Sequence, residues 1–456
     1  MRVSEAVRRR IRGQPDLPPG PRRPPLLQTW AWVRQPVALL EDCARRFGSR
    51  FTLRFIGGRS YVIVSDPTDV KRVFTARPDV LLSGRANENF RPFVGDHSLF
   101  VLDGVAHKRR RRMITPPLRG DHLRSHGELI RDLTLADMKS WPRDRPFRAI
   151  DRMRDITLEV IIRAVFGVVD PDRAARITRL TNALTERGSA VLTFIRPLHI
   201  DLGPRSPWGR FVRVREGLFC ELRDEIARAR RDPHRRDDIL ARLVAQSESQ
   251  GDPMTDDEIL SELLTLVAAG HETSTAALAW AFQWLLGDPE VRRRAVTEAR
   301  DHATAGVFDP AAAGKLEVLV GATYETLRLS PVIPIVPRWC AEPLSLGDIE
   351  LSAGTYVAPC VYLTQRDPAV YPEPDRFMPE RFAQSRPGPF EYFPFGGSHR
   401  LCVGNSFTLF EVPLILATVF AAAELSLAGP RRQAFGRHGI TLSPAGGTPI
   451  RLERRL

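Results

Sequence analysis

The most informative stretch of the sequence is FPFGGSHRLCVG, residues 393–404. Its single cysteine, Cys402, follows a turn containing Gly396 and Gly397 and precedes an apolar, helix-like run. A sulfur just before a helix start is stabilised as a thiolate, because free backbone N–H groups and the positive end of the helix dipole face it. The glycines permit a tight path close to a flat ligand, and Phe395 can shield the sulfur from water. These are the needs of a haem-ligating cysteine, although a lone cysteine here is also commonly a small buried apolar residue.

A second segment, TDDEILSELLTLVAAGHETSTAALAW, opens at Thr255 with a capping box and continues as an apolar-periodic helix. Ala269 and Gly270 leave a hollow on this helix, and Thr273 lies one turn beyond Ala269 on the same face. Room for a diatomic molecule, a hydroxyl to bond it and the carboxylate of Glu272 to relay protons are what an oxygen-activating site requires. The alternative is that Thr273 bonds the carbonyl four residues earlier and that Glu272 forms a surface salt bridge.

Apolar residues recur at three and four spacing over most of the chain, which predicts a mainly helical protein. FTLRF and SYVIV flank Gly57 and Gly58 and predict a β-hairpin. Late in the chain, PLSLGDIELSAGTYVAP predicts two short strands on either side of residues 352–354, and GITLSPAGGTPIRLE predicts a closing hairpin. We therefore expect a mobile, basic, Pro-rich segment over residues 1–25, and a single two-lobed domain, mainly α with small β-sheets, over residues 26–456.

Composition is that of an ordinary globular protein, with 43% hydrophobic and 27% charged residues among 456. The net charge of +13 favours an acidic partner, although the Arg and Ala bias of a high-GC genome produces the same excess. Five scattered cysteines without a CxxC pair indicate neither a disulfide framework nor a zinc ribbon, which fits a reducing cytoplasm. No segment of about eighteen uninterrupted apolar residues is found, so we expect no integral membrane segment.

Two further pairs stand one helical turn apart. Glu325 and Arg328 lie in LVGATYETLRLSP, just before a helix stop, and could be an ordinary surface pair. His107 and Arg111 lie in DGVAHKRRRRM and could reach one anionic group together. The rest of that basic run is either a solvated face or a docking site for an acidic electron donor.

The cysteine segment resembles the haem-binding loop of the cytochrome P-450 family, F-x-x-G-x-[RH]-x-C-x-G. Phe395, Arg400, Cys402 and Gly404 match, whereas Ser398 replaces the usual glycine, at a cost of about 1 kcal/mol if its backbone is left-handed. The helix segment matches the family's A/G-G-x-[DE]-T-[TS] completely at residues 269–274.

The resemblance extends from Pro18 to the end of the chain, with the motifs in the family's order. It includes E-x-x-R at Glu325 and Arg328, followed by YPEPDRFMPERF, which contains Arg381. One further departure is Gln365, where the family often has histidine and where we assign no chemistry.

The resemblance implies a role for each candidate residue. Cys402 is the axial ligand of the haem iron, and Thr273 and Glu272 are catalytic. Glu325, Arg328 and Arg381 form a structural network behind the haem. The cofactor-binding residues are Cys402, His107, Arg111, Arg338, Arg400, Phe395, Ala269 and Gly270.

The implied protein is a soluble, bacterial, actinobacterial-looking monooxygenase that uses haem b and O₂ to hydroxylate or epoxidise an apolar small molecule such as a lipid, terpenoid or polyketide. Without a flavin or iron–sulfur motif, its NAD(P)H-derived electrons must come through a separate ferredoxin and ferredoxin reductase. Substrate walls are expected at residues 87–100, 193–211, 269, 273 and 332–336. Rival hypotheses are a peroxide-using or rearranging haem-thiolate enzyme, a non-catalytic haem protein, and a basic nucleic-acid or lipid-surface protein, for which no recognised nucleic-acid motif is present.

Overall fold

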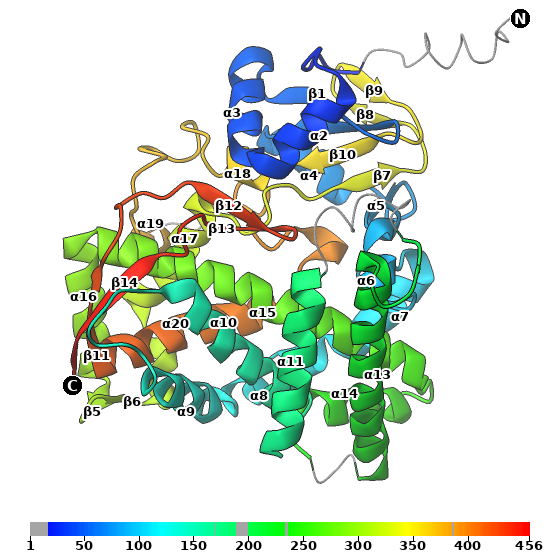
Figure 1. The fold of residues 1–456 in the computed structure, drawn as a ribbon. Coiled ribbons are helices and arrows are strands. Elements are labelled where there is room, and N and C mark those ends of the chain that lie inside the picture. The colour runs from blue at the N-terminus through cyan, green and yellow to red at the C-terminus, as the bar shows by residue number, and fades with distance from the viewer. Residues whose placement is uncertain (1–16, 169, 188–198, 233–235, 385–386) are drawn as a thin grey trace, which may run out of the picture.

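The longest helix, α15 (Asp256–Gly287), runs through the middle of a helical lobe, with a smaller β-rich lobe above it (Figure 1). The computed structural model describes residues 17–168, 170–187, 199–232, 236–384 and 387–456. Thr255 caps α15 in a complete capping box with Glu258, as the sequence predicts. Most of this helix is buried, so it forms the axis around which the other helices pack.

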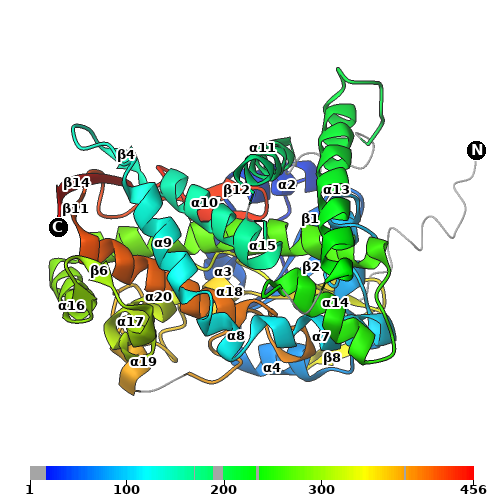
Figure 2. The ribbon, with the colours of Figure 1, turned by 90° about the horizontal axis from the view of Figure 1, so that it is seen from below.

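The largest hydrophobic core lies between α15 and the helices of one side of the lobe. Seen from below, these helices lie to the left of α13 and α14 (Figure 2). The core helices are α9 (Gly127–Met138), α10 (Ala149–Val160), α16 (Pro289–Asp301), α17 (Glu317–Leu329) and α20 (Asn405–Ala422). By length and composition α20 alone among the described residues could cross a membrane, but 67% of it is buried inside the protein. We therefore interpret α20 as a core helix.

A second core joins α15 to the outer helices. The larger of these are α7 (Gly104–Ile114), α11 (Pro171–Arg187), α13 (Pro207–Arg231) and α14 (Ile239–Ser249). Between α10 and α11, a π-turn over Ile161–Val165 packs against α15. Short helices complete the lobes: α5 (Ser83–Ala86), α6 (Arg91–Val94), α8 (Asp121–Arg124), α18 (Val361–Thr364) and α19 (Arg381–Gln384).

The upper lobe is built on a five-stranded sheet of order β1-β2-β10-β7-β3. Its first two strands form the predicted hairpin, and β10 joins β2 in parallel although nearly three hundred residues separate them. The strands are β1 (Arg50–Phe55), β2 (Arg59–Val64), β3 (Leu81–Leu82), β7 (Arg338–Cys340) and β10 (Tyr356–Pro359). The helices α2 (Pro25–Arg34), α3 (Pro36–Phe47) and α4 (Pro67–Thr75) pack with this sheet.

The start of the chain is attached to the same sheet. Thr52 donates its hydroxyl to the Pro18 carbonyl at 2.7 Å, and its backbone N–H donates to the Pro19 carbonyl at 3.0 Å. The last part of the predicted N-terminal segment, residues 17–24, is thus held on the sheet of the domain, whereas residues 1–16 lie outside the described residues.

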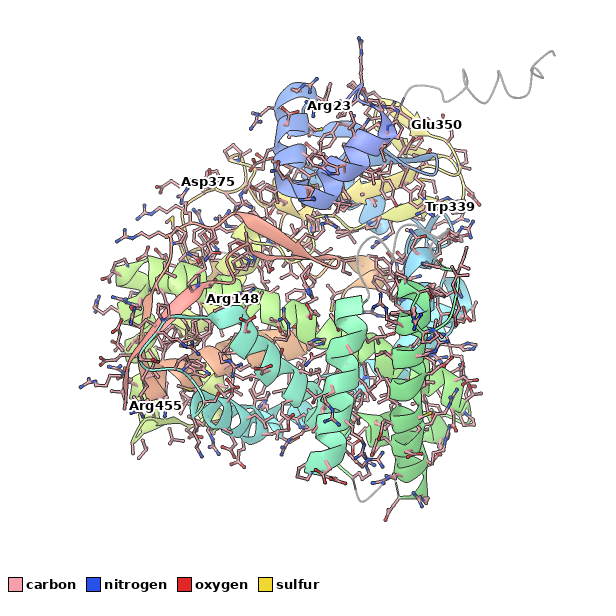
Figure 3. All side chains as sticks on the ribbon, in the orientation of Figure 1. Arg23, Arg148, Trp339, Glu350, Asp375 and Arg455 are labelled. Carbon is pink, nitrogen blue, oxygen red and sulfur yellow. The ribbon has the colours of Figure 1, made fainter. Side chains whose placement is uncertain are left out.

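The closing hairpin expected over residues 439–453 is wrong. β13 (Thr441–Pro444) pairs with β12 (Phe435–His438), and β14 (Pro449–Arg455) pairs instead with β11 (Ala423–Leu427) and β4 (Phe147–Arg148). Arg148 and Arg455 mark the two ends of this second sheet on the left flank (Figure 3). The small hairpins are β5 (Ala303–Thr304) with β6 (Val307–Phe308), and β8 (Leu344–Leu346) with β9 (Ile349–Leu351), which adds a strand to the two expected there.

Candidate functional site

The cysteine loop folds as a tight turn ahead of α20. The Cys402 N–H donates to the Phe395 carbonyl at 2.9 Å, and Gly396 has a φ of +70°. A β-carbon at Gly397 would come within 2.6 Å of the Phe74 ring, so only glycine fits there. Ser398 has a φ of +59°, and the strain expected from replacing the usual glycine is therefore present.

The Cys402 side chain is both accessible and desolvated. It is solvent-exposed, yet desolvation by the surrounding protein raises the pKa of its thiol. The Gly404 N–H and the charge of Arg111 act in the opposite direction and favour the thiolate. A group that is both accessible and desolvated must face a cavity rather than the outer surface, which is where a ligand of the sulfur has to lie.

The middle of α15 provides a second accessible surface. Ala268 and Ala269 are exposed in a helix whose flanking turns are buried, and Gly270 and Thr273 are half-buried. The Thr273 hydroxyl donates to the Ala269 carbonyl at 2.6 Å, which is the backbone bond that the sequence left as an alternative. A β-carbon at Gly270 would come within 2.8 Å of Ile161, so the small residue is needed for packing of the π-turn.

A cluster of basic side chains, three arginines and one histidine, adjoins the cysteine. Burial lowers the pKa of His107 to about 3, and the charges of Arg400, Arg111 and Arg338 add to this effect. Burial likewise lowers the pKa of Arg338 to about 9 and of Arg400 to about 10. Among the described residues Arg400 pairs with Asp103, but no acidic side chain forms an ion pair with Arg111 or Arg338. A desolvated group of cations with one carboxylate between them suits a ligand that carries negative charge, such as the two propionates of haem.

The basic run around the site divides into two parts. Arg109 bonds Asp252 and Glu258, and Arg110 is buried against the start of α15. Lys108 and Arg112 are exposed. Only these last two fit the expectation of a basic docking face on α7.

The Glu325 and Arg328 pair is fully buried rather than on the surface. The guanidinium donates to both carboxylate oxygens at 2.7 and 2.8 Å, and both side chains are 0% exposed. Arg381 donates to the same carboxylate at 3.3 Å, and Met378 donates its N–H at 3.0 Å. The structure thus brings together all three residues of the predicted network.

Glu272 points away from the hollow on α15, into a basic cluster. Its Oε2 atom is 3.0 Å from His438 Nδ1 and its Oε1 atom is 3.3 Å from His271 Nε2. Arg154 lies 3.7 Å away. Burial acts to raise the pKa of Glu272, but the bonds and charges of His271 and His438 hold that pKa well below its usual range.

Of the predicted substrate walls, residues 193–198 lie outside the described residues. Residues 98–100 are fixed to α15: the Leu99 N–H donates to Glu262 at 2.7 Å, and the Ser98 and Thr265 hydroxyls are 2.6 Å apart. Burial of Glu262 raises its pKa to about 8.

Three residues near the site escape the sequence patterns. His438 lies on a strand far along the chain, and no local spacing links it to Glu272. Gln365 bonds both the Glu325 helix and the cysteine loop. Glu411 is a buried acid on α20, where burial raises its pKa to about 8 and the Ser274 hydroxyl partly offsets the rise. An acid inside the apolar run that follows Cys402 was a visible signal for it.

Known proteins resemble this chain over nearly its whole length. The family model for cytochrome P450 matches residues 18–446. A protein of Mycobacterium tuberculosis provisionally named cytochrome P450 135B1 is 35% identical over 90% of this chain and 86% of its own length. Another protein from that organism, provisionally named cytochrome P450 138, is 34% identical over 96% of this chain and 97% of its own length. The structure of a retinoic acid-bound cyanobacterial CYP120A1 superposes with a TM-score of 0.83, covering 96% of this chain and 99% of that chain at 23% identity. This match confirms the predicted fold.

Proposed function

Because the chain belongs to the cytochrome P450 family, we propose that it is a haem-thiolate monooxygenase that inserts one oxygen atom of O₂ into an apolar small molecule, by hydroxylation or epoxidation. The observation that carries this proposal is the Cys402 sulfur, accessible inside the protein and bordered by a desolvated cation cluster. A flat, dianionic cofactor with a thiolate-binding metal satisfies both features at once.

Haem b fits the residues present. Cys402 would ligate the iron, with Phe395 beside the loop, and Ala269 and Gly270 would leave room above the ring. His107, Arg111, Arg338 and Arg400 would hold the propionates. Bound there, haem supplies the activation of O₂, and the electron-rich thiolate favours O–O cleavage.

The remaining steps belong to the protein. Thr273 offers a hydroxyl at the hollow of α15, and its bond to the Ala269 carbonyl holds that hydroxyl in place. Glu272, the next residue back, would supply the proton-carrying carboxyl group after turning from His271 and His438 toward the hollow. Glu325, Arg328 and Arg381 keep the segment behind the cysteine loop rigid, through contacts that exclude water.

Separate redox proteins would supply the electrons, a ferredoxin and its reductase, with the exposed Lys108 and Arg112 attracting the acidic ferredoxin. The half-buried Ile333 and Val336 and the buried Val332 and Ile335 favour an apolar substrate. The retinoic acid of the structural neighbour supports the same class. All five cysteines are free, which supports a reducing, cytoplasmic location.

The test is the absorption spectrum of the reduced, carbon monoxide-treated protein in the wild type, Cys402→Ala and Cys220→Ala. Cys220 is exposed and far along the chain from the loop, so its variant is the matched control. We expect a strongly red-shifted Soret band in the wild type and control that is lost in Cys402→Ala. Absence of a haem band in wild-type protein after haem-supplemented expression would refute the proposal.

The rival haem-thiolate reactions are separated by the oxygen source. With ferredoxin, reductase and NADPH under ¹⁸O₂, a monooxygenase places label in the product. A peroxide-driven enzyme forms product from H₂O₂ alone, and a rearranging enzyme forms product without label.

A further inference from the structure

His438 lies at the end of β12, next to the tip of the β12–β13 hairpin, and crosses to the buried helix α15. The hairpin is held on α15 independently of this histidine, because Trp280 donates its indole N–H to the Leu442 carbonyl at 3.1 Å. Trp280 also packs against Phe435, with ring centroids 4.8 Å apart. The hairpin that positions His438 beside Glu272 is therefore attached to α15 through Trp280. The contact between His438 and Glu272 is not the only link between the hairpin and the helix.

His271 lies on the other side of Glu272, and its two ring nitrogens have different partners. Its side chain is 0% exposed and its Nδ1 atom lies 2.7 Å from the Val267 carbonyl. A carbonyl oxygen only accepts, so Nδ1 carries a hydrogen. Nε2 then faces Glu272 Oε1 at 3.3 Å, and two lone pairs would repel at that distance. Neither of these two atoms has a hydrogen-bond partner among the described residues, and the enclosed His271 ring offers Glu272 no path to solvent.

The His438 side chain is different, because it is 41% exposed while the Glu272 side chain is 11% exposed. With Nδ1 on the carboxylate, the second ring nitrogen is the one that can meet water. Imidazole is the side chain that takes a proton on one nitrogen and releases another from the second nitrogen near neutral pH. Neither Arg154, which always keeps its charge, nor the enclosed His271 can bring a proton in from solvent in this way.

We propose that His438 is the solvent-facing proton relay that reloads Glu272 during turnover. Water gives a proton to Nε2 of His438, and the Nδ1 proton passes to Oε2 of Glu272. The ring ends neutral with its hydrogen on Nε2; rotation of the ring about its Cβ–Cγ bond then brings Nδ1 to water, where proton exchange restores the starting tautomer. One proton enters and one leaves, and no electrons move.

The charged surroundings fit this role. Glu272 is faced by His271 from its own helix, by Arg154 from α10 and by His438 from the hairpin. Next to His438, Arg437 is turned to the Trp32 ring of α2, with 5.1 Å from its guanidinium carbon to the ring centroid. A proton on His438 thus lies directly beside the carboxylate that is to receive it, and the low pKa of Glu272 means that the proton is passed on rather than kept.

The inference rests on the proposed function, and two variants separate relay from attachment. In His438→Asn the side-chain N–H replaces the Nδ1–H and can still hold Glu272, but an amide does not relay protons. His438→Phe removes both the bond and the relay. His302→Asn is the matched control, because His302 is a half-buried histidine elsewhere, at the end of α16.

Four measurements are made on each loaded enzyme: the carbon monoxide spectrum, amide hydrogen exchange over residues 435–444, product formed per O₂ consumed, and the solvent isotope effect. We expect His438→Asn to keep the wild-type spectrum and wild-type exchange. Its coupled turnover should fall about tenfold, less than the roughly hundredfold or more that a directly acting proton donor contributes, because His438 acts through Glu272. The solvent isotope effect should rise.

His438→Phe should show the same loss with faster exchange in the hairpin, and His302→Asn should match the wild type. The relay is overturned if His438→Asn couples like the wild type while His438→Phe does not, because His438 would then act only by holding Glu272. It is also overturned if both variants couple normally. A missing thiolate spectrum or missing product in the wild type would instead refute the proposed function itself.

Discussion

Glu325→Gln should destabilise the protein far more than the same change at a surface pair of identical spacing. The wild-type carboxylate neutralises a guanidinium that is 0% exposed, and it also accepts from Met378 and Arg381. Glutamine keeps the size of the side chain but leaves the buried charge of Arg328 uncompensated. Removing one partner of such a pair costs about 3–5 kcal/mol. That is a large part of the roughly 5–15 kcal/mol that holds a typical domain folded.

The assay is urea unfolding followed by intrinsic tryptophan fluorescence. For a chain of this length the unfolding free energy falls by about 3 kcal/mol or more per molar urea. The expected loss of unfolding free energy therefore lowers the urea midpoint of unfolding by about 1 M. Glu290→Gln is the matched control, because Glu290 pairs with Arg293 at 2.6 Å with the same three-residue spacing while both side chains are about two-thirds exposed. We expect no measurable shift for it. Equal midpoints for the two variants would refute the view that burial, rather than the pairing motif itself, gives Glu325 its importance.

Three further outcomes are expected. Thr273→Ala should keep the carbon monoxide band but consume O₂ with less product, since the hydroxyl at the hollow is lost; unchanged coupling, measured against an oxygen electrode, would contradict this. Ser398→Gly should raise the urea midpoint by an amount equal to about 1 kcal/mol, because glycine adopts a φ of +59° without strain, and a lowered midpoint would count against the strain. For Glu262 the pKa is raised from 4.5 to about 8, so its contribution to folding is complete below about pH 4.5 and is lost as the pH rises through about 8. Glu262→Gln should therefore flatten the fall in unfolding free energy across that window, and an unchanged slope would show that Glu262 titrates normally.

Local patterns were sufficient for the elements that carry the chemistry. The cysteine loop, the capped helix with its small residues and the Glu325 helix each depend on spacings within a few turns, and the hairpin of β1 and β2 depends on a Gly-Gly turn. Such features are specified by neighbouring residues, so a sequence reveals them.

Local patterns were not sufficient to predict which strands pair with one another. Residues 445–448 look like a hairpin turn, and Gly447 and Thr448 do take φ values of +68° and +52°. The chain does not fold back, however, because the Thr448 carbonyl accepts from Ala149 and the Thr448 hydroxyl donates to Ala279. Two segments distant in sequence therefore direct β14 away from β13, and no pattern within the segment contains that information.

The contacts of Gln365 likewise could not be predicted from local patterns. Gln365 connects the buried Glu325–Arg328 ion pair to the cysteine loop through hydrogen bonds. Its side-chain amide donates to the Leu327 and Arg328 carbonyls at 2.9 and 3.1 Å, which are groups that the end of α17 leaves without helical partners. Its side-chain oxygen accepts the N–H of Phe393, the first residue of the cysteine loop, at 3.1 Å. Arg328 in turn donates to the Gln365 carbonyl at 2.9 Å. The Glu325 pair thus fixes Gln365, and Gln365 fixes the start of the loop, so a change that unpairs Arg328 should disturb the position of the sulfur as well as the stability of the fold.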